Sequence, residues 1–200
     1  MSALQSVRHT TWGGLLLAGG QSRRMHADKS QLRSDKLASA SLVEHACQQL
    51  RIVNDNNFFL AQSSADCPDD FRFVVDGIAA SGPLRAVQQF CKDCHLDYLL
   101  LTAVDMPKIN APQLMALMSY AQSVGSTSLV CENESSQMGF PVALHSSSFA
   151  DLSVIEHASL FKALEEVGVG KVPHAVISTD RQLNINTPQQ WLQYCEMSND

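Results

Sequence analysis

Short apolar runs alternate with amphipathic segments along most of the chain, and this alternation restricts the possible folds more than any other feature. The runs are continuous and rich in Leu, Val and Phe, which is typical of strands covered on both faces. Strands are predicted at Trp12–Leu17, Asn57–Leu60, Phe71–Val75, Tyr98–Thr102, Ser128–Cys131 and Phe140–Leu144. Helices are predicted at Leu37–Leu50, Pro83–Phe90, Ala111–Tyr120, His157–Val167 and Pro188–Tyr194. The alternation predicts an α/β fold, with helices on both faces of a mostly parallel sheet.

The length and composition of the chain fit one globular unit. The chain has 200 residues, of which 45% are hydrophobic and 17% charged. Such values are ordinary for a folded domain and argue against intrinsic disorder. With no internal repeat and no long linker, the sequence predicts a single domain over residues 1–200, in which residues 1–11 form a polar lead-in.

Charge and hydropathy exclude several classes of partner. A formal net charge of -6 argues against a protein that coats nucleic acid. The longest apolar runs, near Gly13–Gly20 and Tyr98–Val104, are far too short to cross a membrane. The first residues, MSALQSVRHTTW, lack the apolar stretch of a signal peptide. We therefore expect a cytoplasmic protein with reduced cysteines and with neither a nucleic-acid nor a membrane partner.

The stretch CKDCH, Cys91–His95, matches the C-x-x-C-H template for haem attachment and also contains a C-x-x-C pair. Haem attachment usually requires export, for which the sequence has no signal. A redox pair of the thioredoxin type would begin a helix after a strand, whereas this motif follows a predicted helix. We interpret it as the end of that helix.

The stretch GLLLAGGQSRRMHADK, Gly14–Lys29, runs from a predicted strand into two glycines and then into positive charge. Gly19 and Gly20 lack a Cβ, so their backbone can approach an oxygen-rich ligand closely. Arg24 and Lys29 supply charge that neutralises phosphates. The alternative is a strand–turn–helix junction with a solvated basic edge. The motifs of P-loop NTPases and of dinucleotide-binding dehydrogenases are both absent from the sequence.

A second candidate site residue is Asp105, in LLLTAVDMP. A carboxylate directly after an apolar strand is costly to bury, so it is either exposed at the sheet edge or paired with a cation. Mg²⁺ prefers one or two carboxylates together with waters and substrate phosphates. The alternative is a cap for the turn at Met106–Pro107. Because ligands of such sheets bind at the carboxyl ends of the strands, Asp105 and the glycine loop are expected at one edge.

The sequence resembles the molybdenum cofactor guanylyltransferase family, within the nucleotide-diphospho-sugar transferase-like superfamily. The resemblance is carried, in the family's order, by LAGGQSRRMHADK (17–29), VVDG (74–77), SGPL (81–84), AVDMP (103–107), FPVAL (140–144) and NINTPQQWL (184–192). These blocks span nearly the whole chain, and the first block is the most specific. The resemblance implies a Rossmann-like three-layer α/β/α fold.

The resemblance also implies an activity: transfer of GMP from GTP to molybdopterin, the organic part of the molybdenum cofactor, with Mg²⁺ present and pyrophosphate released. Partners would be GTP, molybdopterin and cofactor-carrier or acceptor enzymes. The residues it implies for nucleotide binding are Leu17, Ala18, Gly19, Gly20, Lys29, Asp76 and Asp105. Arg24 and Lys29 would face the triphosphate, Asp105 would hold Mg²⁺, and Asn184 and Asn186 would lie on the pterin side. Arg24, Lys29 and Asp105 form the implied catalytic set.

Several positions depart from the family pattern, among them His26 and Ala86. His26 stands where the family usually has Gly, and Ala86 replaces a Gly expected shortly after SGPL. A non-Gly residue does not enter a positive-φ turn cheaply. Three functions therefore remain open: a guanylyltransferase acting on molybdopterin, a related nucleotidyltransferase using CTP or another acceptor such as a sugar or lipid phosphate, and a non-catalytic nucleotide-binding relative.

Overall fold

A seven-stranded sheet forms the centre of the protein, with the strand order β3-β2-β1-β4-β6-β5-β7. The computed structural model describes residues 10–19, 31–38, 40–75, 82–133, 135–157 and 159–197. The strands are β1 (Trp12–Leu17), β2 (Asn57–Ala61), β3 (Arg72–Val75), β4 (Tyr98–Ala103), β5 (Leu129–Glu132), β6 (Met138–His145) and β7 (Gly170–Lys171). Strands β1 to β4 are mutually parallel, and β6 runs antiparallel to both of its neighbours, β4 and β5. The predicted mostly parallel sheet is confirmed.

Strand β1 lies at the middle of the parallel part, between β2 and β4. All six of its residues are buried. Its glycines admit close neighbours: a Cβ on Gly13 would lie 2.3 Å from a Leu96 methyl, and one on Gly14 would lie 2.3 Å from the Asn57 side chain. The strand predicted from Leu15 and its apolar neighbours is therefore a core strand, as its continuous hydrophobicity indicates.

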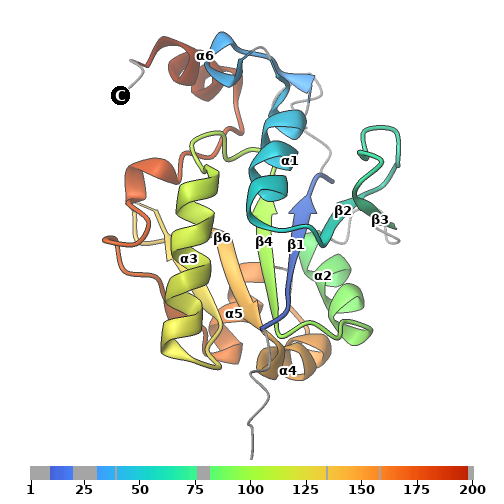
Figure 1. The fold of residues 1–200 in the computed structure, drawn as a ribbon. Coiled ribbons are helices and arrows are strands. Elements are labelled where there is room, and N and C mark those ends of the chain that lie inside the picture. Colours follow the sequence, from blue (N-terminus) through green and yellow to red (C-terminus); the bar gives the residue numbers. More distant parts are fainter. Residues whose placement is uncertain are drawn as a thin grey trace, which may run out of the picture.

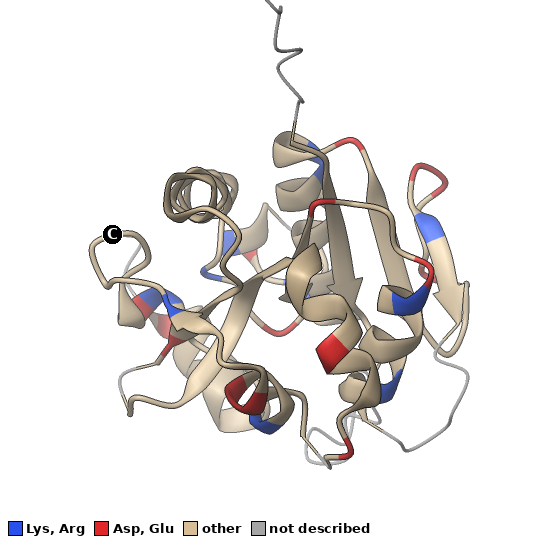
Figure 2. Cartoon of the chain, turned by 90° about the horizontal axis from the view of Figure 1, so that it is seen from below, with Lys and Arg blue, Asp and Glu red and all other residues tan. Residues whose placement is uncertain are grey.

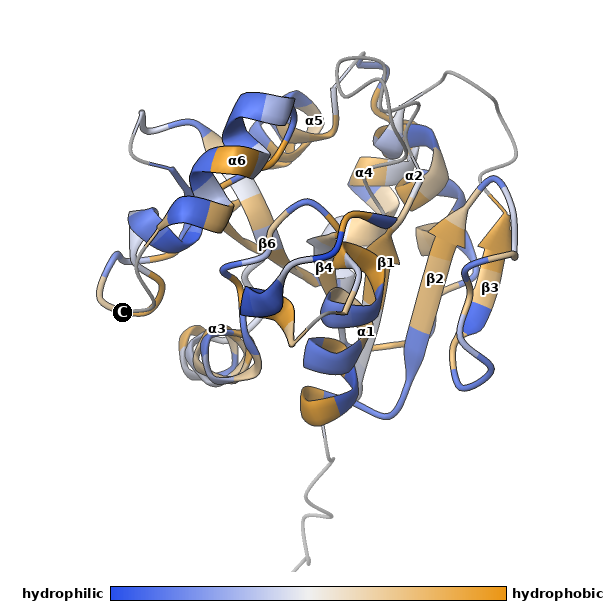
Figure 3. Cartoon of the chain, turned by 90° about the horizontal axis from the view of Figure 1, so that it is seen from above, coloured by the Kyte–Doolittle hydropathy of each residue, from blue (hydrophilic) through white to orange (hydrophobic). Residues whose placement is uncertain are grey.

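Helices cover both faces of the sheet, which gives the predicted three layers (Figures 1 and 3). The helices are α1 (Leu42–Val53), α2 (Pro83–Lys92), α3 (Ala111–Val124), α4 (Phe149–Val154), α5 (Leu160–Val167) and α6 (Pro188–Glu196), with 3-10 turns at Asp35–Leu37, Ser146–Ser148 and Thr179–Arg181. Helices α1 and α3 pack together on one face, and α2, α4 and α5 pack together on the other. Figure 3 also shows the strands as the hydrophobic layer between them.

The first helix begins later than predicted, at Leu42 and not at Leu37. Ala38 takes the left-handed conformation, with φ 51°, and so ends the short 3-10 turn that precedes it. Ser41 then caps α1: its hydroxyl accepts from the Glu44 N–H, and the Glu44 carboxylate accepts from the Ser41 N–H. The apolar spacing predicted the helix correctly, but this capping box decided where it begins.

The buried side chains form two hydrophobic clusters. The larger cluster fills the space between the sheet and the five helices α1 to α5. The smaller one joins Leu37 and Leu42 to Ile185 and Tyr194, with Trp191 packed against it. Helix α6 is therefore held by a cluster of its own, above the carboxyl ends of β1 and β4 (Figure 1).

Acidic and basic residues are interspersed over the helices and loops of the described chain (Figure 2). None of the helices in these ranges combines the length and hydrophobicity that a membrane-spanning segment needs.

Candidate active site

Leu17, the last residue of β1, begins the predicted nucleotide loop. It is buried, Ala18 is half-buried, and Gly19 is exposed. The N–H groups of Ala18 and Gly19 both donate to the Leu60 carbonyl, at 2.9 and 3.1 Å. The turn after β1 is thus fastened to β2. Because these two N–H groups already have an acceptor, we expect any backbone donors to a phosphate to come from later residues of the loop.

Four of the residues expected at the nucleotide lie outside the described residues: Gly20, Arg24, Lys29 and Asp76. His26 lies outside them as well. Their roles stay predictions. The residues just before these two gaps are described: Gly19 follows β1 and Val75 ends β3. Because β1 and β3 are both parallel to β2, the carboxyl ends of these strands lie at one edge of the sheet.

Asp105 follows β4 at this same edge. Strands β1 and β4 pair in parallel with Leu17 opposite Ala103, and the Val104 N–H lies 3.4 Å from the Leu17 carbonyl. The nucleotide loop and Asp105 therefore leave adjacent strands at the same level. This juxtaposition is the one that the sequence predicts from the rule for strand ends.

The carboxylate of Asp105 is half-buried, and its Oδ1 atom is enclosed by protein. Carboxylate oxygens are the donors that Mg²⁺ prefers. Within the described ranges there is no group of three or more His, Cys, Asp or Glu residues that could hold a metal ion. A single carboxylate of this kind fits a site in which waters and phosphate oxygens supply the other ligands.

Asn184 and Asn186 lie in the irregular segment before α6. The Asn186 amide nitrogen donates to the Asn184 amide oxygen at 2.7 Å. The main-chain N–H of Ile185, which lies between them, donates to the Asp105 carbonyl at 2.9 Å. Two blocks that are far apart in the sequence, AVDMP and NINTP, therefore meet through their backbones.

Part of the NINTP block has an ordinary structural role. Thr187 is the N-cap of α6, since its hydroxyl accepts from the Gln190 N–H, and Pro188 begins the helix. The Gln190 side-chain oxygen accepts from the N–H groups of Asn186 and Thr187, at 2.8 and 3.0 Å. The side chain of Asn184 is exposed and takes no part in this cap.

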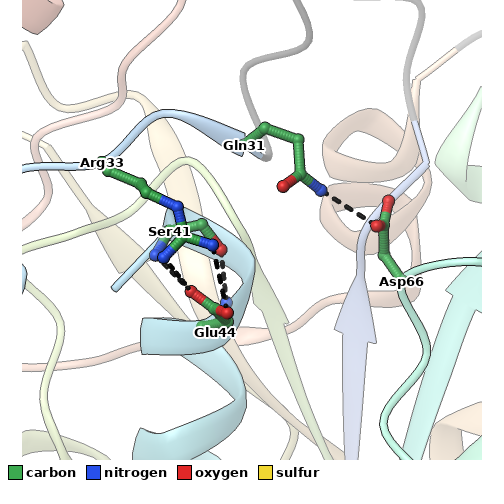
Figure 4. Close-up of polar contacts among 5 residues, drawn as sticks. All are labelled: Gln31, Arg33, Ser41, Glu44 and Asp66. Carbon is green, nitrogen blue, oxygen red and sulfur yellow. Dashed lines mark hydrogen bonds and ion pairs between the residues drawn. The ribbon is translucent and has the colours of Figure 1, made fainter. Parts of the chain in front are cut away.

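Sequence reasoning did not identify the contacts that hold residues 31–38, the continuation of the nucleotide loop (Figure 4). The Gln31 amide donates to the Asp66 carboxylate at 2.9 Å, which ties this segment to the loop after β2. The Arg33 guanidinium donates to both carboxylate oxygens of Glu44, at 2.8 and 3.2 Å. No local pattern signals the first contact, because its partners are remote in the sequence and belong to separate loops.

Among the described titratable side chains, several are inert because they are buried. Burial raises the pKa of the Cys47, Cys91 and Cys131 thiols to about 12, so they are not thiolate nucleophiles at neutral pH. Cys91 lies in the last turn of α2, and Cys94 and His95 follow the helix. The interpretation of CKDCH as a helix end is confirmed.

Comparisons with known proteins show what this chain is similar to. The family model of the MobA-like NTP transferase domain matches residues 14–171. A probable molybdenum cofactor guanylyltransferase of Mycobacterium avium is 33% identical over 106 residues, which are 51% of this chain and 53% of that protein. The match thus spans about half of that relative's length. A protein of the same name from Rhodopirellula baltica is 25% identical over 190 residues, covering 88% of this chain and 87% of the relative.

The fold has close counterparts among solved structures. Molybdopterin-guanine dinucleotide biosynthesis protein A from Archaeoglobus fulgidus superposes with a TM-score of 0.71 at 17% identity, over 92% of this chain and 96% of that one. The predicted nucleotide-diphospho-sugar transferase-like fold is confirmed, and so is the family resemblance inferred from the sequence blocks. Because this family model matches most of its length, the chain belongs to the family of MobA-like NTP transferase domains.

Proposed function

We propose that the protein is a Mg²⁺-dependent guanylyltransferase that joins GMP from GTP to molybdopterin and releases pyrophosphate. The observation that carries this proposal is the hydrogen bond from the Ile185 N–H to the Asp105 carbonyl. It brings the asparagine-bearing segment next to the carboxylate, which itself adjoins the end of β1. A nucleotide site, a metal ligand and an acceptor site would then share one edge of the sheet.

On this proposal the nucleotide binds to the loop that begins at Leu17. Leu17, Ala18, Gly19 and Gly20 would line the guanine, the ribose and the phosphates, with backbone N–H donors to phosphate supplied from Gly20 onward, since those of Ala18 and Gly19 bond to Leu60. Asp76 would also contact the nucleotide. Arg24 and Lys29 would contact the triphosphate, where cationic donors stabilise phosphate oxygens. The names of the curated relatives support guanine as the base.

Asp105 would hold Mg²⁺ together with phosphate oxygens and waters. When bound, the ion would neutralise charge on the phosphates, including the charge that moves to the leaving group. The main chain at Asp105 is held by the hydrogen bond from Ile185, and this supports the role because it fixes the position from which the carboxylate projects.

The chemistry requires positioning more than covalent work by the protein. A phosphate oxygen of the acceptor attacks the α-phosphorus of GTP, the new P–O bond forms, and the bond to the bridging oxygen of the β-phosphate breaks. Pyrophosphate carries away the electron pair of that bond. Arg24 and Lys29 would stabilise the shifting charge, while Asn184 and Asn186 would orient the acceptor.

Amide side chains suit an acceptor with both donor and acceptor groups, as pterins have, because each amide offers an N–H₂ group and a carbonyl oxygen. The contact between the Asn186 nitrogen and the Asn184 oxygen does not use the Asn184 N–H₂ group. The exposed Asn184 is the residue that we expect to contact the pterin.

The non-catalytic alternative rests on His26 and Ala86, and the structure supplies a packing reason for the second. Ala86 lies in α2, is 6% exposed and belongs to the larger hydrophobic cluster. Its methyl group packs into the core, so the Ala86 substitution has a packing role and does not by itself favour the non-catalytic alternative. His26 lies outside the described residues.

The decisive experiment measures pyrophosphate release by the purified protein with Mg²⁺, molybdopterin and each of GTP, CTP, ATP and UTP. We expect release with GTP only, and only when molybdopterin is present. Release with CTP, or with a sugar phosphate in place of molybdopterin, would identify a related transferase. GTP binding without release under any of these conditions would identify a non-catalytic relative.

Thermal shift with each nucleotide supplies an independent measure of base preference. A nucleotide at a concentration of 100 times its dissociation constant should stabilise the protein by about 2.7 kcal/mol. We expect GTP with Mg²⁺ to raise the melting temperature more than CTP with Mg²⁺.

A further inference from the structure

Residues 183–197, which we call the C-terminal anchor, are held by the segment that continues the nucleotide loop. Ile185 and Tyr194 are buried with Leu37 and Leu42 in the smaller hydrophobic cluster, apart from the main core. This cluster is small and is separate from the main core. Its two sides are the anchor and residues 32–42, so displacement of one side changes the packing of the other.

Polar contacts also join the carboxyl end of the anchor, residues 194–197, to residues 34–36. The Lys36 ammonium donates to the Met197 carbonyl at the end of α6, and its nitrogen lies 5.5 Å from the centre of the Tyr194 ring. A cation is favourable at the carboxyl end of a helix, where unpaired carbonyl groups gather. The Cys195 sulfur lies 3.8 Å from the Ser34 hydroxyl.

The near end of the anchor is fastened to the candidate metal ligand. The Ile185 N–H donates to the Asp105 carbonyl, and the cap of α6 at Thr187 and Gln190 holds the residues that follow. The anchor therefore joins the backbone of Asp105 at one end to residues 34–37, which follow the nucleotide loop, at the other.

Residues 31–38 are themselves fixed on a second side. Gln31 is bonded to Asp66, and Arg33 pairs with Glu44 at the start of α1 (Figure 4). Residues 31–38 thus contact α1 and the loop after β2 on one side, and α6 on the other side. Residues 31–38 follow directly on the loop to which the nucleotide is proposed to bind.

We propose that Ile185 and Tyr194 are positioning residues, through which nucleotide bound at the loop raises the affinity of the asparagine segment for the acceptor. The inference rests on the proposed function, since it needs a nucleotide at residues 17–29 and an acceptor at Asn184. Neither Ile185 nor Tyr194 touches a substrate. Ile185 acts through the Asp105 backbone, and Tyr194 acts through Lys36 and Leu37.

A fluorescence experiment tests the coupling without turnover. The chain has two tryptophans, so Trp12→Phe leaves Trp191 as the reporter on α6. Trp12 stacks on Tyr98 with ring centres 4.4 Å apart, and Phe keeps an aromatic ring there. Trp191 packs against Tyr194, with ring centres 5.7 Å apart. We expect GTP with Mg²⁺ to change Trp191 emission over the same concentration range as the heat of binding measured by calorimetry.

Variants at the contact between α6 and Lys36 are compared with a variant on the exposed face of α6. In the Trp12→Phe background, Tyr194→Ala and Lys36→Met should abolish the emission change while calorimetry still reports GTP binding, and Tyr194→Phe should keep it. Leu192→Ala is the control, because Leu192 is 59% exposed on the same helix and should leave the response unchanged. Lys36→Met keeps the test decisive if Tyr194→Ala does not fold.

Acceptor affinity supplies the second readout. In the unmodified protein we expect saturating nucleotide to tighten molybdopterin binding by about fivefold or more, the usual lower range of site-to-site coupling. Tyr194→Ala should remove this factor and raise the KM for the acceptor, with kcat at saturating acceptor nearly unchanged, whereas Tyr194→Phe should restore it.

The outcomes separate the two proposals. Heat of GTP binding without any change at Trp191 overturns the coupling and leaves the guanylyltransferase proposal standing. Equal acceptor affinity with and without nucleotide does the same. No heat with any of the four nucleotides overturns the proposed function and, with it, this inference.

Discussion

The main-chain N–H of Ile185 donates a 2.9 Å hydrogen bond to the main-chain carbonyl of Asp105. The two residues belong to different blocks of the sequence, one just after the central strand β4 and one before the last helix. The bond uses no side-chain atoms, so the position of Asn184 relative to the carboxylate is set by backbone geometry. Substitution of the Asn184 or the Asp105 side chain therefore tests chemistry with little effect on this relationship.

The first prediction concerns Asp105. Asp105→Asn keeps the size of the side chain and the backbone bond to Ile185 but removes the negative charge. We expect Mg²⁺-dependent pyrophosphate release to fall by about a hundredfold or more, because stabilisation of transferring phosphate charge is lost. The melting temperature without nucleotide should change little. Asp151→Asn, an exposed position on α4, is the control and should retain full activity. Normal turnover by Asp105→Asn would show that this residue does not hold the metal.

The second prediction concerns Lys29, which we expect at the triphosphate. Lys29→Ala removes a charged donor, so the KM for GTP should rise about tenfold to a hundredfold. Steady-state kinetics at varied GTP and saturating acceptor measure this change. The control is Lys162→Ala on the exposed face of α5. An unchanged dependence on GTP concentration would contradict the role assigned to Lys29.

The third prediction concerns the start of α1. Ser41→Ala removes the hydroxyl that accepts from the Glu44 N–H, and so breaks one half of the capping box. The loss should lower the free energy of unfolding by about 1 kcal/mol and the melting temperature by about 2–4 °C. Urea denaturation measures the free energy directly. Ser123→Ala, at an exposed position near the end of α3, should change it much less.

The fourth prediction concerns the pH dependence of stability. Burial lowers the pKa of His45 below its ordinary value of 6.5. A hydrogen bond with the Pro107 main chain raises this pKa, but by less than burial lowers it. Between the two pKa values the unfolded chain binds more protons than the folded chain, so stability rises with pH in this window. We therefore expect the free energy of unfolding to fall as the pH decreases below about 6.5.

His45→Asn should remove this part of the pH dependence, which is read as the difference between the stability–pH curves of the variant and the parent protein. His174→Asn, at an exposed position, is the control. Parallel curves for His45→Asn and the parent between pH 5 and 7 would contradict the assignment, since the unfolded pKa of histidine lies in that range.

The regular elements were largely predictable because their signal is local. The bounds predicted for β1, Trp12–Leu17, agree with the structure, and Pro83 and Pro188 mark the true starts of α2 and α6. The two-residue strand β7 and the short helix α4 were missed, because elements of that length carry too little periodicity to recognise. The antiparallel direction of β6 was also not predicted, since strand direction is set by pairing and not by the residues of the strand itself.

The sequence by itself determined the class of fold, the family and the chemical character of the candidate residues. Hydrophobic periodicity, glycine and proline positions and charged side chains act over a few residues, so they can be read along the chain. Tertiary structure alone decided which of those residues meet. The bonds of Gln31 to Asp66 and of Ile185 to Asp105, and the burial of Tyr194 in one cluster with Leu37, join residues that no local pattern relates. Such contacts arise only when folding closes long stretches of chain, and many different pairs of residues could satisfy the same backbone donors and apolar surfaces.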